Sequence, residues 1–341
     1  MEVSPRIKVS VVVPVYNKAP FLAEAFESIL SQTFTDFELI AVDDCSTDDS
    51  LAILRSFTDP RLRIIALDQN LGPAGAAQRA MDAAMGEYIV RMDADDISVP
   101  ERVALQVAFM DANPDIGASG GQLRLFGEEQ VYWRFPQDPD ACAAQLLFGV
   151  PVSQGACILR RSLLETHDLR YDADWPRVGE DWLFWLRMAR YTRFANLDHV
   201  ILNYRRGEHN IGHGRDIHAD YMFLLRKVLF GLGIPHTETD VELHLLGLRI
   251  FAVPPGSASV RALRQWYDRL LLHNTHIGFA PSEAFRHRVA KQWEGIFYWI
   301  THYGIRVAFE HLILSNGWPM DRILYAFKYR LNVWAGKIPN N

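Results

Sequence analysis

The chain has little cysteine and no long apolar run, and both shortages limit what it can be. Its three cysteines, Cys45, Cys142 and Cys157, are odd in number, widely separated and not in metal-ligand spacing. We therefore expect a reduced, cytoplasmic protein without a disulfide framework. No apolar run approaches the ~20 residues that a membrane span requires, and the first residues, Met1 to Pro5, do not have the pattern of a signal peptide.

Glycine is missing from the loop after the first apolar run, where residues 16–20 read Tyr-Asn-Lys-Ala-Pro. A dinucleotide-binding turn needs glycines there so that a pyrophosphate can approach the backbone, which argues against a dehydrogenase. The net charge of −6 argues against a general nucleic-acid binder. The charge is uneven, because from Phe285 onward eight Lys and Arg residues stand against three Asp and Glu residues.

The feature that stands out is the acidic tetrapeptide Asp93-Ala94-Asp95-Asp96. Three carboxylates on one short turn repel one another, which costs stability unless a positive charge neutralises them. A divalent cation that bridges to a phosphate is a suitable partner, because hard cations prefer oxygen ligands. The alternative is a solvated acidic turn that caps a helix beginning near Pro100.

Strand and helix patterns alternate over the first 115 residues. The segments with strand character are 9–15, 37–42, 63–67 and 87–92, and those with helix character are 20–30, 46–57, 72–85 and 100–113. Such alternation predicts a doubly wound, mostly parallel sheet flanked by helices, with ligands at the carboxyl ends of the strands. Asp43-Asp44 and the tetrapeptide from Asp93 to Asp96 follow two of these strands. We therefore expect them to line one crevice.

The rest of the chain is less regular. From 116 to 210 the clear patterns are a helix at 181–191 and a strand at 200–204, and beyond Asp216 the chain reads as mostly helical. We predict one domain at 1–215, with a regular part at 1–115 and a less regular part at 116–215. A helical C-terminal region follows at 216–341.

Several motifs occur in a fixed order along residues 7–210. They are Val11–Asn17 (VVVPVYN), Ser28–Thr33 (SILSQT), Phe37–Ile40 (FELI), Val42–Asp48 (VDDCSTD), Gly86–Ile89 (GEYI), Met92–Asp96 (MDADD) and Gly179–Arg187 (GEDWLFWLR). Together they resemble the family 2 glycosyltransferases of the GT-A fold. The resemblance implies transfer of a sugar from a nucleotide-diphosphate donor with inversion at the anomeric carbon. It makes 1–215 the catalytic domain, with a nucleotide-sugar half at 1–115 and an acceptor and catalytic-base half at 116–215. It does not extend to the helical tail.

The resemblance assigns the nucleotide to residues after the first two strands. Pro14, Tyr16 and Asp44 match positions that hold the base, with Asn17 beside them. Asp44 would accept the uracil N3–H and Tyr16 would pack on the ring, which favours a UDP-sugar. The alternative for Asp44 is helix capping by an acidic pair.

The resemblance also implies a metal site. Asp95 would bind the Mg²⁺ or Mn²⁺ that neutralises the diphosphate leaving group. Asp93 would support that ion or contact the ribose, and Ala94 would lie against the donor. His209 matches a position of basic contacts to the diphosphate, which makes it a further candidate ligand. An exposed histidine on a polar loop is the alternative.

Asp181 matches the family's general base, the carboxylate that removes the proton of the acceptor hydroxyl. Glu180 would lie beside it on the acceptor side. The alternative is an acidic helix N-terminus, which the helix dipole favours. Both can hold, because that field would keep Asp181 ionised.

Two departures from the family pattern affect the donor and acceptor sites. In Ala76-Ala77-Gln78-Arg79 the expected arginine is shifted or lost, so Arg79 is a candidate phosphate contact in an altered register. Gln154 replaces a common histidine in a region that faces the acceptor. The processive signature Gln-x-x-Arg-Trp is absent, which indicates single addition. A non-catalytic sugar-nucleotide-binding module is the alternative from a different class.

The basic tail adds a further hypothesis. Its aromatic residues are interleaved with basic ones, namely Trp293, Phe297, Tyr298, Trp299, Tyr303, Phe309, Trp318, Tyr325, Phe327, Tyr329 and Trp334 with Arg306, Arg322, Lys328, Arg330 and Lys337. Such helices suit the surface of an anionic membrane, where a lipid-linked acceptor for bacterial surface polysaccharide would be found. This predicts peripheral contact with the inner face of the cytoplasmic membrane. The alternative is a helical subdomain that packs its aromatic residues internally.

Overall fold

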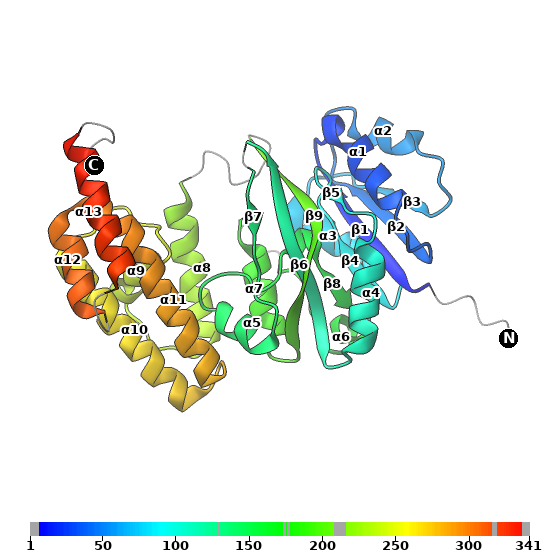
Figure 1. Ribbon diagram of the computed structural model, residues 1–341. Helices are drawn as coiled ribbons and strands as arrows, with labels where there is room; N and C mark the ends of the chain where they lie inside the picture. Colours follow the sequence, from blue (N-terminus) through cyan, green and yellow to red (C-terminus); the bar gives the residue numbers. More distant parts are fainter. Residues whose placement is uncertain are drawn as a thin grey trace. The chain divides into compact units, whose positions relative to one another are not determined.

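The computed structural model describes residues 7–128, 130–172, 175, 178–207, 216–315 and 319–335. The chain divides into two compact units, Met1–Arg215 and Asp216–Asn341. The first combines a sheet with helices, and the described part of the second consists of helices and their connections (Figure 1).

The N-terminal unit holds a nine-stranded sheet. Its strands are β1 (Val9–Val15), β2 (Phe37–Asp43), β3 (Leu62–Ala66), β4 (Tyr88–Arg91), β5 (Ile97–Ser98), β6 (Ile116–Gly127), β7 (Tyr132–Trp133), β8 (Ile158–Arg160) and β9 (Arg193–Arg206). Its helices are α1 (Ala19–Leu30), α2 (Ser50–Ser56), α3 (Gly72–Asp82), α4 (Arg102–Ala112), α5 (Pro139–Gln145), the 3₁₀ turn η1 (Gln154–Ala156), α6 (Arg161–Thr166) and α7 (Glu180–Met188).

The strand order places the predicted ligand-binding ends side by side. The sheet runs β3-β2-β1-β4-β8-β6-β9-β5, with β7 paired to β6. The pairs β3–β2, β2–β1 and β1–β4 are parallel, so their carboxyl ends lie at one edge. β8 is antiparallel to both β4 and β6, whereas β9 runs parallel to β6. The loops after β1, β2 and β4 therefore meet at one edge of the sheet.

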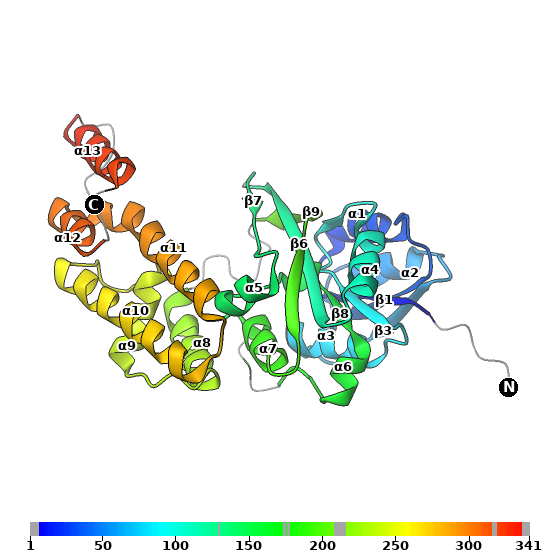
Figure 2. The ribbon, with the colours of Figure 1, turned by 60° about the horizontal axis from the view of Figure 1, so that its bottom comes forward.

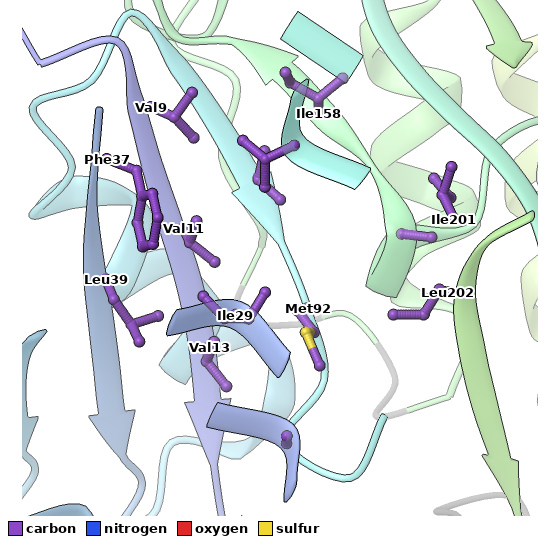
Figure 3. Close-up of a cluster of buried hydrophobic side chains, with 14 of the residues drawn as sticks. Val9, Val11, Val13, Ile29, Phe37, Leu39, Met92, Ile158, Ile201 and Leu202 are labelled. Carbon is purple, nitrogen blue, oxygen red and sulfur yellow. The ribbon is translucent and has the colours of Figure 1, made fainter. Parts of the chain in front are cut away.

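The central strands are buried on both faces, as their continuous apolar runs predict. Val9, Val11 and Val13 of β1 point into one cluster with residues of α1, α2 and α4, part of which Figure 3 shows. Val12 points into a second cluster with residues of α3, α5, α6 and α7. Helices thus cover both faces of the sheet (Figure 2). The predicted α/β fold, with helices on both faces and a helical C-terminal part, is confirmed.

The prediction of an irregular region after residue 116 was wrong, because a 12-residue strand, β6, begins there. Four glycines lower its strand propensity and hide it from pattern analysis. Packing requires them: a Cβ added at Gly120 would lie 2.7 Å from Asn196 Oδ1, and one at Gly121 would lie 2.9 Å from the carbonyl oxygen of His199. The close approach of β9 and its neighbours, rather than local preference, therefore keeps glycine in this strand.

The C-terminal unit is a set of packed helices. They are α8 (Ile217–Gly231), α9 (Glu238–Gly247), α10 (Ser257–Ile277), α11 (Ser282–Ile300), the 3₁₀ turn η2 (Thr301–Tyr303), α12 (Ile305–Leu314) and α13 (Met320–Trp334). Trp293 and Phe297 are buried, whereas Phe327 and Trp334 are exposed. The tail therefore both packs aromatic side chains inside the unit and leaves others outside.

Two of the tail residues singled out in the sequence, Trp318 and Lys337, lie outside the described residues. Across the described helices, none combines the length and the apolar character needed to cross a membrane.

Candidate functional site

The loops after β1 and β2 are tied together by side-chain hydrogen bonds. Asn17, which adopts a positive φ of 50°, accepts the Thr47 backbone N–H at 2.8 Å through Oδ1. Its own backbone N–H donates to Ser46 Oγ at 3.1 Å. Lys18 is held in the same way, since its backbone N–H donates to Ser50 Oγ at 2.8 Å. Asn17 therefore shapes the loop that carries Tyr16, whose side chain is 45% exposed.

Asp44 is buried and caps a helix, although a different helix from the one that follows it in sequence. Its Oδ1 accepts the Leu71 N–H at 2.7 Å and its Oδ2 accepts the Gly72 N–H at 2.9 Å, at the start of α3. The negative charge is favourable there, because the first N–H groups of a helix lack backbone partners. Each carboxylate oxygen has two lone pairs, so capping leaves acceptor capacity for a ligand.

The remaining donor-site candidates lie on the elements around this edge. Pro14 is near the end of β1 and partly buried, and Ala94 is buried in the acidic turn. Arg79 is exposed in the last turn of α3. Its neighbour Gln78 instead accepts the backbone N–H of Tyr171 at 3.0 Å, so the shifted register turns Gln78 toward the segment before α7.

Protein cations already surround the acidic turn from Asp93 to Asp96. Lys18 Nζ pairs with Asp95 Oδ2. Arg205 donates its backbone N–H to Asp96 Oδ1 at 2.8 Å and its Nε–H to the backbone oxygen of Asp95 at 2.9 Å. The repulsion predicted from the sequence is therefore offset in part by side chains of the chain itself. Arg205 therefore anchors the turn to β9.

Asp96 is the most deeply buried member of the turn. Burial and the charges of Asp93 and Asp95 raise its pKa well above the ordinary value. Its Oδ2 is buried without a hydrogen-bond partner among the described residues. Beneath the turn lies Arg102, fully buried, whose guanidinium donates to the backbone oxygen of Arg91 at 2.6 Å. Arg102 thus adds positive charge below the carboxylates.

Arg91 links the acidic turn to the segment that precedes α7. Its buried guanidinium lies 3.6 Å from Asp93 Oδ1 and donates to the Tyr171 hydroxyl at 3.4 Å. The same hydroxyl accepts a hydrogen bond from the side-chain N–H of Gln154. The Tyr171 ring stacks on Phe184 of α7, with ring centroids 4.6 Å apart. One buried arginine therefore connects the donor-side carboxylates with the helix that carries Asp181.

Glu180 and Asp181 form the first turn of α7, after Gly179 in the left-handed conformation (φ 80°). Asp181 Oδ1 accepts the Trp182 N–H at 2.8 Å. Burial raises the pKa of Asp181, and the Trp182 N–H and the charge of Arg91 oppose that rise. Burial, followed by the charge of Asp181, raises the pKa of Glu180 to about 8. Two adjacent carboxyls thus have pKa values shifted toward neutrality, as general acid–base chemistry requires.

The raised pKa of Glu180 makes a pH-dependent contribution to stability. The folded chain holds the Glu180 proton up to about pH 8, whereas the ordinary carboxyl loses it near 4.5. Between these values the folded state binds the extra proton, so stability falls as pH rises through this window. Asp181, Arg91 and Asp93 are the charged groups that face Glu180.

Replacing Glu180 by glutamine should flatten that dependence. Because glutamine does not titrate, the variant should lose less stability between pH 5 and pH 8.5, by on the order of a few kcal/mol. Thermal unfolding at both pH values measures the effect, with Glu165→Gln, an exposed carboxyl on α6, as the matched control. Equal slopes for the Glu180→Gln variant and the native chain would contradict the assignment.

The carboxylates of the acidic turn fit a hard divalent cation only if the phosphates of a bound substrate supply the remaining ligands of that cation. Among the described residues no three His, Cys, Asp or Glu side chains form a metal-binding group. Asp93 and Asp95 offer hard oxygen donors, and the buried Asp96 Oδ2 lacks a partner among the residues described. Mg²⁺ is commonly held by one or two carboxylates together with substrate phosphates. These residues fit that mode, and His209 lies outside the described residues.

Sequence analysis missed three residues that the fold brings into this site. Arg91 had a local signal, as the only charged residue in the apolar strand before the acidic turn. Lys18 is 77 residues from Asp95 in the chain, so only the strand order explains their pairing. Tyr171 lies in a loop without a pattern. The structure thus connects Asp93 with α7 through Arg91 and Tyr171, while Gln154 joins them through the Tyr171 hydroxyl.

Comparison with known proteins identifies a family and several relatives of this chain. The Glycosyl transferase family 2 model matches residues 10–167. The succinoglycan biosynthesis protein ExoO of Rhizobium meliloti is 36% identical over 258 residues, covering 66% of this chain and 70% of that protein. An uncharacterized glycosyltransferase of Haemophilus influenzae is 31% identical over 211 residues, covering 58% of this chain and 65% of the relative.

A third relative carries a specific activity in its name. The UDP-Glc:alpha-D-GlcNAc-diphosphoundecaprenol beta-1,3-glucosyltransferase WfgD of Escherichia coli is 25% identical over 206 residues, covering 60% of this chain and 79% of that protein. Succinoglycan synthesis is thus named for the R. meliloti relative and glucosyl transfer for the E. coli relative.

Solved structures share the fold at low sequence identity. Staphylococcus aureus TarS 1-349 in complex with UDP-GlcNAc superposes with a TM-score of 0.59 at 21% identity, covering 95% of this chain and 92% of that one. The mannosyltransferase PcManGT from Pyrobaculum calidifontis, in complex with GDP-Man and Mn²⁺, gives 0.52 at 20% identity over 91% of this chain and 86% of that one. The architecture of the chain is therefore that of the GT-A glycosyltransferases.

Proposed function

Because this chain belongs to glycosyltransferase family 2, a family of transferase enzymes, we propose that it moves a sugar from a nucleotide-diphosphate donor to a hydroxyl of a glycan or lipid-linked acceptor. The names of its relatives, one in succinoglycan biosynthesis and one acting on a diphosphoundecaprenol-linked sugar, support a role in bacterial surface polysaccharide synthesis. A lipid-linked acceptor would place the reaction at the inner face of the cytoplasmic membrane, with the helical C-terminal region in peripheral contact.

The observation that carries this proposal is the connection through Arg91. A donor site needs positive charge and a place for a diphosphate, and an inverting transferase also needs a base on the opposite side of the anomeric carbon. With a cation bound, the turn from Asp93 to Asp96 would supply the donor side, where the Lys18 ammonium adds positive charge. Asp181 on α7 would supply the base. Arg91 contacts both Asp93 and Tyr171, so the two halves are held in register by one buried side chain.

The donor nucleotide is assigned to the loops after β1 and β2. We propose that Tyr16 stacks on the base and that Asp44 accepts the uracil N3–H with the lone pairs that capping leaves available. Pro14 and Asn17 shape this pocket, and Ala94 lies below the sugar-phosphate. A UDP-sugar is the donor that this acceptor group favours, and the S. aureus neighbour with bound UDP-GlcNAc supports it.

Asp95 and Asp93 are the residues that would hold Mn²⁺ or Mg²⁺, with His209 as a further candidate. When bound, such an ion would neutralise the diphosphate as it leaves. Lys18 would remain close to the same diphosphate, since its ammonium already lies at Asp95. The Lys18 ammonium and the metal ion would then both balance the negative charge of the leaving diphosphate.

The chemical step is assigned to Asp181. Its carboxylate takes the proton of the acceptor hydroxyl while that oxygen forms a bond to the anomeric carbon. The bond from that carbon to the diphosphate breaks, and its electron pair leaves with the nucleotide. Glu180 is protonated near neutral pH, because its pKa is about 8. Asp181 is therefore the ionised carboxylate of the pair. Gln154 and Glu180 face the acceptor.

A donor panel tests the proposal. With Mn²⁺ present, UDP-sugars should bind more tightly than GDP-sugars in calorimetry, and an acceptor should trigger release of UDP. Tyr16→Ala should weaken UDP binding by about tenfold through lost stacking, with thermal stability unchanged because Tyr16 is exposed.

Tyr132→Ala, which removes an exposed aromatic residue from β7, is the matched control for that variant. Tighter binding of GDP-sugars by tenfold or more, a margin of about 1.4 kcal/mol, would overturn the uridine assignment. Donor binding without any transfer to a panel of acceptors would instead indicate a binding module.

A further inference from the structure

Helix α13 exposes a continuous apolar stripe. Met320, Leu324, Phe327, Leu331 and Trp334 are 64%, 59%, 65%, 48% and 87% exposed. They follow one another at alternating spacings of four and three residues. Residues at that spacing lie on one side of a helix. Single exposed apolar residues are ordinary on protein surfaces, but five in one line form a patch that calls for a partner.

The opposite side of α13 is already used. Ile323, Tyr325 and Ala326 pack on the cluster of Phe297, Ala308 and Leu312, which belongs to α11 and α12. On the same side, Tyr329 is buried, and Arg322 pairs with Glu294 at 3.2 Å. The helix is therefore held within its unit, and the apolar stripe lies on the side that the described residues of that unit leave exposed.

A second helix of the same unit repeats the pattern. On α12, Ile305, Phe309 and Ile313 are 65%, 52% and 55% exposed and recur every fourth residue. The buried residues of α12, Val307, Ala308, His311 and Leu312, lie on its other side. Two helices in succession thus keep an apolar stripe outside the core of their unit.

The charges beside the stripe on α13 are basic. On a helix with 3.6 residues per turn, Lys328 and Arg330 fall about 80° to either side of the centre of the stripe. Asp321 is the one acidic residue of this helix, and its carboxylate accepts the Tyr298 hydroxyl at 3.1 Å. Exposed Arg306 adds a positive charge on α12. The surroundings of the stripe therefore favour an anionic partner.

We propose that the apolar stripe of α13 lies in the interface of an anionic lipid bilayer. An apolar stripe flanked by Lys and Arg, with a tryptophan on it, is the pattern of helices that lie in the plane of a membrane surface. The exposed side chain of Lys328 can reach headgroups while its stem covers apolar surface, whereas the Arg330 guanidinium donates to the Thr301 backbone oxygen at 3.1 Å and adds its charge from within the unit. This inference rests on the proposed function, which includes a lipid-linked acceptor. It deepens that function by assigning the surface that would hold the enzyme at the membrane, close to this acceptor.

A second copy of the chain fits the stripe less well. Two identical stripes packed together would bring the exposed Lys328 of one copy close to Lys328 of the other. Like charges across an interface are unfavourable, whereas anionic headgroups complement them. The charge pattern therefore selects the lipid surface over self-association.

Flotation with vesicles tests the proposal on the full chain. The native protein should float with vesicles of phosphatidylglycerol and phosphatidylethanolamine, and not with phosphatidylcholine alone. Raising the salt should reduce the bound fraction, because the Lys and Arg contribution is screened. The double variant Leu324→Glu/Phe327→Glu should bind about tenfold more weakly. Phe230→Glu, which places the same charge on an 80% exposed apolar residue of α8, is the matched control.

Two outcomes would overturn the proposal: absence of flotation by the native chain, or equal binding by the double variant and the control. A dimer in sedimentation that the double variant abolishes, together with no flotation, would assign the stripe to self-association. Donor binding without vesicles should be the same in all variants. Since flotation needs no donor and donor binding needs no lipid, failure of this inference and failure of the proposed reaction are distinguishable.

Discussion

Replacing Asp181 by asparagine should lower turnover by about 10² to 10⁴ while leaving donor affinity nearly unchanged. Asparagine keeps the shape of the side chain and its acceptor for the Trp182 N–H, but it cannot take a proton from the acceptor hydroxyl. The loss should therefore appear in the chemical step and not in donor binding. Single-turnover kinetics with saturating donor, together with calorimetry, separates the two.

Stability provides the control for this variant. Because burial raises the pKa of Asp181, a neutral side chain at this position should be tolerated, and thermal unfolding near neutral pH should not show a loss of stability. NMR of the product of the native enzyme should report an anomeric configuration opposite to that of the donor. Retention at that carbon, or normal turnover by the Asp181→Asn variant, would overturn the single-displacement mechanism.

Replacing Asp95 by alanine should abolish the metal dependence of donor binding and weaken that binding by about 100-fold or more with Mn²⁺ present. The variant also removes the partner of Lys18, so two effects must be separated. Lys18→Met keeps the Asp95 carboxylate and removes only the ammonium. Calorimetric titration of UDP with and without Mn²⁺ should show that Lys18→Met retains metal dependence and that Asp95→Ala does not.

The comparison of these two variants is decisive for the role of Asp95. If Asp95 served only to hold Lys18, both variants would lose donor affinity equally and keep the same response to Mn²⁺. An Asp95→Ala variant with the native response to Mn²⁺ would contradict the metal assignment. Circular dichroism of both should match the native chain, because Arg205 holds the turn through the backbone oxygen of Asp95.

Local patterns predicted the strands and helices of the nucleotide half well. The run from Val9 to Val15 coincides with β1, because consecutive β-branched residues favour a strand that is buried on both faces. The placement of Asp44 and Asp93 after parallel strands of one sheet, β2 and β4 on either side of β1, also followed from the alternation of strand and helix patterns. The same reasoning failed after residue 116, because the glycines of β6 are required by close packing with distant residues and carry no local strand signal.

The sequence by itself determined the fold class, the order of the motifs and the candidate carboxylates, since these depend on residues that are near one another in the chain or on the periodicity of burial. Only the tertiary structure decided which charges meet. It placed Lys18 on Asp95, made Asp44 the cap of α3 rather than of the helix that follows it, and set Arg91 between Asp93 and Tyr171. Apart from the Arg91–Asp93 pair, these contacts join residues 28 to 80 positions apart. The strand order and packing that create them are properties of the whole folded unit.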